Sequence, residues 1–163
     1  MNEEVLLIKK DRMRYTKDTF SANLILVAIV LDALYFVSIY QSDVGSYYYN
    51  WVIGASIIYN LLFLLVAFLA SEGVKNRKGG YTAILGFIGL MQIVRVFYLP
   101  AMAHAAEVTI GTETVPAMGD NQYIYVVACL IVSGLCCLVA AVVSHKNNKT
   151  LTEYMKTIET NPA

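Results

Sequence analysis

Six polar side chains interrupt stretches of the sequence that are otherwise apolar, and together they have the chemistry of a buried polar site. They are Asp32, Tyr35, Tyr59, Asn60, Gln92 and Arg95. An acid and a base with amides and phenols beside them can bind a small polar or cationic solute, or relay a proton. They can equally hold neighbouring helices in register, through hydrogen bonds worth roughly 0.6–2 kcal/mol each. Both interpretations require that the elements carrying these groups bring them to one level.

Four apolar stretches carry these residues, over 20–40, 50–70, 81–99 and 123–144. The chain is 58% hydrophobic and only 15% charged, far from the composition of a water-soluble domain. Each stretch has about 19–22 residues, enough at 1.5 Å per residue to cross a hydrocarbon core of roughly 30 Å. Backbone groups in that core must bond within their own segment, so each stretch is predicted to be a helix. The predicted fold is an all-α integral membrane protein, an up-down-up-down four-helix bundle forming one domain, 1–163.

Asp32 and Arg95 are predicted to lie at nearly the same depth, because both of their helices would run in the same direction. Asp32 lies about 3 Å and Arg95 about 7.5 Å beyond the middle of its stretch. Either charge alone would cost roughly 2.5–3.5 kcal/mol in the hydrocarbon core. The cheapest arrangement turns both toward the bundle, so the sequence predicts an Asp32–Arg95 ion pair. Asn60, at the centre of its stretch, and Gln92, one turn from Arg95, are expected beside it.

Aromatic residues adjoin the same level. Tyr35 lies three residues beyond Asp32, and Tyr59 precedes Asn60. The run Tyr47–Tyr49 follows the first helix and could roof the site, where aromatic faces and the carboxylate would receive an organic cation. The alternative is an aromatic belt at the membrane interface, which needs no ligand.

The distribution of Lys and Arg predicts the orientation, because basic loops are retained on the cytoplasmic side. All but one of the twelve lie before the first stretch, between the second and third, or after the fourth. We therefore expect an N-in/C-in protein of a plasma (inner) membrane, with a basic cytoplasmic segment 1–19, an extracytoplasmic loop 100–122 and a cytoplasmic tail 145–163. A secretory signal peptide would also begin with basic residues, but the long first run and its Asp32 favour a retained helix.

Small residues recur every four positions in the fourth stretch, at Cys129, Ser133, Cys137 and Ala141. This spacing predicts a stripe along which another helix packs closely. The cysteines have no ligand partners nearby in the sequence, so packing is favoured over a redox or metal role.

Local patterns also occur in the loop and the tail. Alternating residues on either side of Gly111 are consistent with a short hairpin. His104 could titrate or bind metal with Glu107, but a solvated loop is the favoured interpretation. In the tail, Thr150 and Glu153 have the spacing of a capping box, which predicts a separate short amphipathic helix.

No catalytic motif is found, and neither a cofactor nor a metal site is predicted. A formal net charge of zero gives no support for nucleic-acid binding. Two hypotheses follow. One is a non-catalytic subunit or scaffold of a membrane complex, with a membrane-protein partner or a second copy of itself. The other is a small solute-binding or transport protein that uses the polar cluster as an outward-facing site.

Overall fold

The computed structural model describes residues 3–15, 17–40, 51–110 and 113–160, which are helical apart from one two-stranded hairpin and short connecting turns. The predicted loop 41–49, including Tyr47–Tyr49, lies outside the described residues. The elements are α1 (Glu3–Tyr15), α2 (Thr19–Tyr40), α4 (Trp51–Lys75), α5 (Gly80–Arg95), α6 (Leu99–Ala105), β1 (Glu107–Ile110), β2 (Glu113–Pro116) and α7 (Asp120–Thr160).

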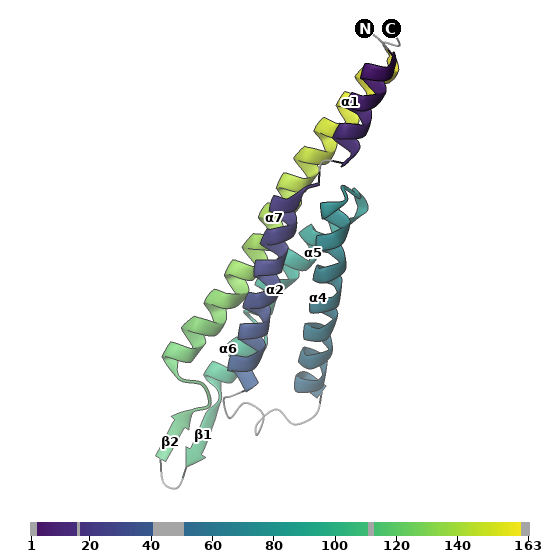
Figure 1. Ribbon diagram of the computed structural model, residues 1–163. Coiled ribbons are helices and arrows are strands. Elements are labelled where there is room, and N and C mark those ends of the chain that lie inside the picture. Colours follow the sequence, from purple (N-terminus) through teal and green to yellow (C-terminus); the bar gives the residue numbers. More distant parts are fainter. Residues whose placement is uncertain (1–2, 16, 41–50, 111–112, 161–163) are drawn as a thin grey trace.

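Four helical segments of the described chain are long and apolar enough to cross a membrane. They are Thr19–Tyr40, Trp51–Lys75, Gly80–Ala105 and Asp120–Thr157. Consecutive segments run in opposite directions, and the two chain ends lie at the same end of the molecule (Figure 1). By helix length and composition this is a multi-pass membrane protein, so the predicted four-helix bundle is confirmed.

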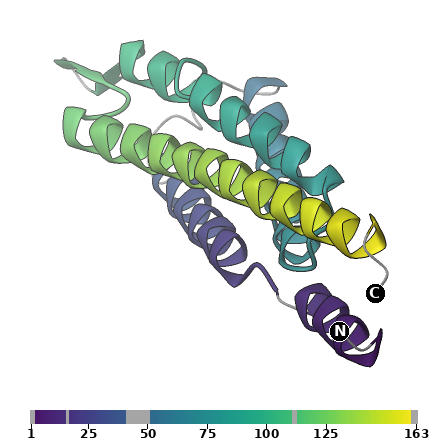
Figure 2. The same ribbon diagram turned by 90° about the horizontal axis from the view of Figure 1, so that it is seen from above.

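The long helix α7 runs along the whole length of the bundle (Figure 2). It packs along α2 on one side and α5 on the other, and α4 packs mainly on α2. Beyond the spans, the end of α7 lies beside α1 (Figure 1). The bundle is therefore built from α2, α5 and α7, with α4 as its most loosely attached member.

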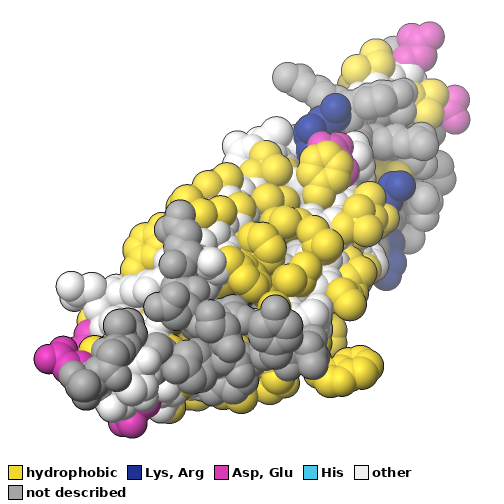
Figure 3. Space-filling view, turned by 90° about the horizontal axis from the view of Figure 1, so that it is seen from below, with side chains coloured by type: hydrophobic (Ala, Val, Ile, Leu, Met, Phe, Trp, Pro, Cys, Tyr) yellow, Lys and Arg dark blue, Asp and Glu magenta, His cyan; other side chains and the backbone are white. Residues whose placement is uncertain are grey.

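The outer surface of the spans is apolar. Val30, Leu61, Phe87 and Val142 are each more than half exposed. On the face in Figure 3, hydrophobic side chains cover the middle and the charged ones lie toward the two ends. Water would penalise such a surface, whereas hydrocarbon would not, so the outer faces of these helices imply contact with a lipid bilayer.

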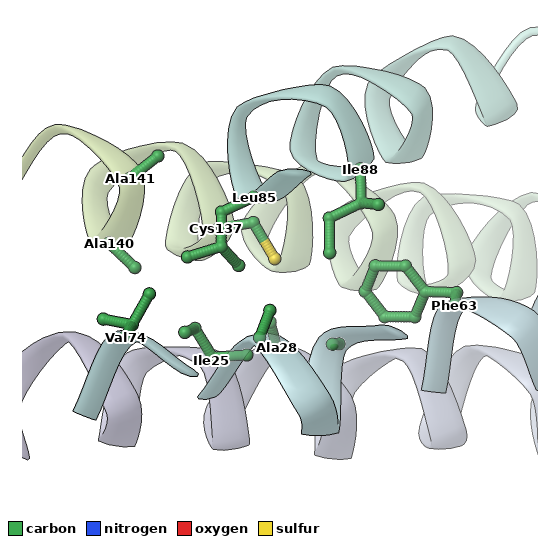
Figure 4. Close-up of a cluster of buried hydrophobic side chains, with 11 residues drawn as sticks. Ile25, Ala28, Phe63, Val74, Leu85, Ile88, Cys137, Ala140 and Ala141 are labelled. Atoms are coloured by element: carbon green, nitrogen blue, oxygen red, sulfur yellow. The ribbon is translucent and has the colours of Figure 1, made fainter. Parts of the chain in front are cut away.

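The interior consists of two apolar clusters. The first joins all four spans (Figure 4) and includes Ile25, Ala28, Phe63, Val74, Leu85, Ile88, Cys137, Ala140 and Ala141. The second lies toward the hairpin and includes Tyr35, Ile39, Val96, Leu99, Ala103, Met118, Val126, Cys129 and Leu130. None of the described buried residues in the second cluster comes from α4. The attachment of α4 is therefore weakest toward the hairpin.

The third span differs from the prediction, because it is not one helix over 81–99. Helix α5 ends at Arg95, a tight turn follows, and α6 resumes at Leu99. Pro100 explains the break, since it has no N–H to donate to the Val96 carbonyl and its ring would clash with that carbonyl in a continuous helix. At the start of α6 its missing N–H costs nothing.

The predicted loop 100–122 is also more ordered than expected, since it contains α6 and a hairpin. Strands β1 and β2 pair antiparallel with Val108 opposite Val115 and Ile110 opposite Glu113, so the predicted hairpin is confirmed. His104 does not lie in a solvated loop. It lies on α6, where its ring stacks on Tyr123 at 4.3 Å between centroids.

The predicted separate helix in the tail is wrong, because α7 runs without interruption from Asp120 to Thr160. Thr150 lies inside it, and its hydroxyl donates to the Lys146 carbonyl at 3.1 Å instead of capping a new helix. The reason is the absence of any Gly or Pro between Leu135 and Asn161 in the sequence. At 1.5 Å per residue α7 is about 60 Å long, roughly twice the hydrocarbon core.

The small-residue stripe of α7 is buried as predicted, with Cys129, Ser133 and Cys137 almost fully enclosed. The closest approach lies beside it, at Gly134. A Cβ there would lie 2.9 Å from the Gly89 carbonyl oxygen of α5. These two glycines set the distance between α5 and α7.

We predict that Gly134→Ala lowers the free energy of unfolding by about 1–3 kcal/mol, because the added methyl would force the two helices apart. Gly86→Ala is the matched control, since a Cβ at Gly86 meets nothing within 4 Å. Thermal or SDS unfolding in detergent micelles measures both. Equal stabilities of the two variants would show that the glycine contact does not set the packing.

Candidate functional site

The Asp32–Arg95 ion pair predicted from the sequence is present. Arg95 Nη1 donates to Asp32 Oδ1 at 2.9 Å, and the side chains are 7% and 0% exposed. Both residues lie between the two apolar clusters, on α2 and α5. A pair so enclosed is neutral as a unit, which is how a helical bundle can hold two charges away from water.

Amide side chains extend the pair into a network. Arg95 Nη2 donates to Asn60 Oδ1 at 2.7 Å, and Nη1 also approaches Gln92 Oε1 at 3.3 Å. Gln92 in turn donates from Nε2 to Asp32 Oδ1 at 2.8 Å. Asn60 and Gln92 therefore lie beside the ion pair, as predicted from the sequence. Through Asn60 the network reaches α4 as well as α2 and α5.

Ser133 connects this network to α7. Gln92 Nε2 lies 3.5 Å from Ser133 Oγ, and Ser133 Oγ donates to the Ala28 carbonyl of α2 at 3.0 Å. From its spacing in the sequence, Ser133 was predicted only as a member of the packing stripe. Ser133 lies near the middle of the fourth stretch, at the depth of Asp32, and on the stripe that faces the bundle. This position could have identified it as a member of the same hydrogen-bond network.

Two tyrosines flank the guanidinium. Arg95 Cζ lies 4.4 Å from the ring centroid of Tyr35 and 4.8 Å from that of Tyr59. A desolvated cation over an aromatic face gains about 2 kcal/mol. Arg95 is thus in contact with five side chains from three helices, and we call the set Asp32, Tyr35, Tyr59, Asn60, Gln92, Arg95 and Ser133 the Arg95 cluster.

One buried polar atom of this cluster, Asp32 Oδ2, has no hydrogen-bond partner among the described residues. Leaving such a group unsatisfied costs roughly 1–3 kcal/mol. The cluster is therefore not fully satisfied by its own side chains, which a purely structural network would normally be.

A cavity of about 420 Å³ lies next to the Arg95 cluster, between α4 and the α5–α6 segment. Arg95, Tyr59 and Ser56 form part of its wall, and the remainder is mostly apolar. It occurs on the hairpin side of Asn60, where α4 contributes no described buried hydrophobic residue to the second apolar cluster. This cavity was not predicted from the sequence, because it depends on the distance between α4 and α5.

A second polar cluster, also not predicted, lies at the opposite end of the bundle. Asp18 caps α2 by accepting from the Ser21 backbone N–H at 3.1 Å, and it accepts from Asn147 Nδ2 at 3.0 Å. Its own N–H donates to the Lys75 carbonyl, and Arg77 Nη1 donates to the Asn147 carbonyl. An acid just before an apolar run is a typical helix cap. Because it ties three spans together, its role here is structural.

His104 has a different acidic neighbour from the one considered in the sequence. Its Nε2 lies 3.8 Å from Asp120 Oδ1, at the start of α7. Across the described residues, no group of three His, Cys, Asp or Glu side chains is arranged to hold a metal ion. The three cysteines are free.

We predict that Asp32→Asn destabilises the fold by about 3–5 kcal/mol, because it leaves the Arg95 charge buried without its counter-ion. The double variant Asp32→Leu with Arg95→Met removes both charges and is expected to lose less. Asp120→Asn is the control, since Asp120 is 87% exposed. SDS unfolding titrations in micelles rank the variants, and a double variant less stable than the single one would contradict the paired-charge interpretation.

The chain matches no protein-family model, no curated protein and no solved structure. Its function therefore has to be inferred from its own geometry. The main features of that geometry are a charge-balanced polar cluster joining four membrane helices and an apolar cavity beside it.

Proposed function

We propose that this protein is a non-catalytic subunit or scaffold of a membrane complex. The observation that carries the proposal is that one polar cluster connects all four spans, through Asp32, Asn60, Arg95 and Ser133. Groups that bind one another in this way fix the register of the helices. The ion pair also disfavours proton cycling, because the guanidinium of Arg95 keeps its charge at any physiological pH.

The helices outside the spans supply a docking element for this role. The end of α7 extends beyond the bundle with α1 beside it (Figure 1). On α1, Leu7 and Ile8 are 60% and 66% exposed. Aliphatic side chains exposed on a helix outside the hydrocarbon core favour contact with a partner protein or with lipid headgroups.

The second candidate function is a small solute-binding or transport protein. It is favoured by the cavity beside Arg95 and by the unsatisfied Asp32 Oδ2. The two candidates differ in what the charges are needed for. A scaffold requires them for helix packing alone, whereas a polar-solute site requires them for binding.

The complex itself is the first test. Solubilised from its native membrane in mild detergent, the chain is expected to run on native gels or in native mass spectrometry as part of a larger assembly. The double variant Asp32→Leu with Arg95→Met should keep that assembly if it folds. A wild-type chain that runs alone as a monomer, or a folded double variant that assembles but loses uptake of a polar solute, would exclude the scaffold.

A matched truncation tests the docking element. Removing residues 150–163 shortens α7 but retains Asn147, which bonds to Asp18 and Arg77. The span should then keep its unfolding temperature while the larger assembly is lost. An assembly that survives this truncation and the removal of α1 would place the contact within the membrane spans instead.

We further propose that both termini are cytoplasmic and that the hairpin lies outside a plasma membrane, as the Lys and Arg distribution favours. In a chain whose native cysteines are replaced by alanine, Thr114→Cys in β2 should react with an impermeant maleimide on intact cells. Thr157→Cys at the far end of α7 should react only after permeabilisation. Both positions are exposed, so the reverse labelling pattern would invert the orientation.

A further inference from the structure

The cavity between α4 and α5–α6 opens on the side of the molecule that faces lipid. Its walls come from membrane-spanning segments, and several wall residues are themselves exposed at the outer surface. Val94, Phe97 and Tyr98 are 58%, 78% and 52% exposed. A molecule dissolved in the bilayer can therefore enter sideways between the helices, without crossing the aqueous phase.

The charge at the cavity wall is balanced, because Arg95 is paired with Asp32 at 2.9 Å. An anion or a cation entering from hydrocarbon would leave an unbalanced charge in a medium of low dielectric constant, which is expensive. A neutral molecule carries no such penalty. The charge balance therefore favours an uncharged ligand.

Arg95 also retains hydrogen-bonding capacity. Its bonds within the described chain run from Nη1 to Asp32 and Gln92 and from Nη2 to Asn60. A guanidinium has five N–H donors, so Nε–H and one N–H of Nη2 have no acceptor among the described residues. Arg95 is 7% exposed and forms part of the cavity wall. These two N–H groups can therefore donate to an oxygen atom of a ligand in the cavity.

The shape and lining of the cavity add a second requirement. Tyr59, Phe97 and Tyr98 contribute aromatic rings to its walls, and Ala55 and Leu99 contribute aliphatic surface. Aromatic side chains pack favourably on planar rings in offset or edge-on arrangements. A volume of about 420 Å³ lies within the usual range for a small-molecule site.

We propose that this cavity binds a neutral, membrane-soluble ring compound with a carbonyl oxygen, of the quinone class, with its carbonyl on Arg95. A bilayer phospholipid also offers carbonyl oxygens, but at the wrong depth. Arg95 lies about 4 Å beyond the middle of the span Gly80–Ala105, whereas ester groups lie at the edge of the core, about 15 Å from its centre. The proposal goes beyond the scaffold function and does not depend on it.

Binding can be measured on the whole protein in lipid nanodiscs through its single tryptophan. Trp51 precedes the wall residue Ala55 by one turn of α4. With decyl-benzoquinone as the probe, we expect saturable quenching of the Trp51 fluorescence. Decyl-benzene, which has a planar six-membered ring and the same tail but no carbonyls, should compete roughly tenfold more weakly or worse, because it offers Arg95 no acceptor.

A matched pair of variants tests the location without disturbing the Arg95 cluster. Ala55→Phe fills the cavity from an exposed position and should weaken binding by roughly tenfold or more. Leu62→Phe adds a similar ring to an exposed position of α4 that does not line the cavity, and should leave binding unchanged. Circular dichroism and unfolding temperature confirm that both variants fold.

Four results would overturn the proposal. One is quenching that rises linearly and equally in the wild type and both variants, which indicates simple partitioning into lipid. Another is equal competition by decyl-benzene, which removes the role of the carbonyl. A third is saturable quenching that survives unchanged in Ala55→Phe, which places the site elsewhere. The last is a tightly held phospholipid, found by native mass spectrometry in the wild type and lost only in Ala55→Phe, with no saturable quinone binding.

Discussion

The structure depends on the cost of placing a guanidinium in hydrocarbon. Arg95 cannot lose its charge and cannot reach water from within the third span, so its stabilisation must come from neighbouring helices. Asp32 supplies the counter-charge, Asn60 and Gln92 supply acceptors, and Tyr35 and Tyr59 supply aromatic contacts at 4.4 and 4.8 Å. Once these groups converge, the vertical register of α2, α4 and α5 is set. The Gln92–Ser133 contact then includes α7.

The packing on either side of the Arg95 cluster is unequal. Toward the chain ends all four spans share one apolar cluster, and Asp18 ties α2 to α7 and to the end of α4. Toward the hairpin, the second cluster is built without a described buried residue of α4. The cavity lies on that side, with Arg95 in its wall. The Arg95 cluster, which joins the four spans, therefore also forms part of the cavity wall, so a structural role and a binding role are compatible in this protein.

Much of the fold was predictable because hydrocarbon imposes simple rules. Long apolar runs must be helices, and charges at matching depths must meet, so four spans and the Asp32–Arg95 pair followed from residue type and position alone. Ser133 and Asp18 were not predicted as members of polar clusters. Hydroxyl groups and helix caps are common in any sequence, and only packing shows which of them bond across helices. The break after Arg95 could have been predicted from Pro100, and the uninterrupted α7 from the absence of Gly or Pro between Leu135 and Asn161.

By itself, the sequence determined that the helices lie in a lipid bilayer, how many of them span it, and which charged side chains had to be paired. These follow from the free energy of transferring each residue into hydrocarbon, which is a local property. Only the tertiary structure decided which donors of Arg95 are used, how close Gly134 comes to Gly89, and where α4 separates from α5. Those features depend on distances between helices, which arise from the fit of many side chains at once and are not encoded at any single position.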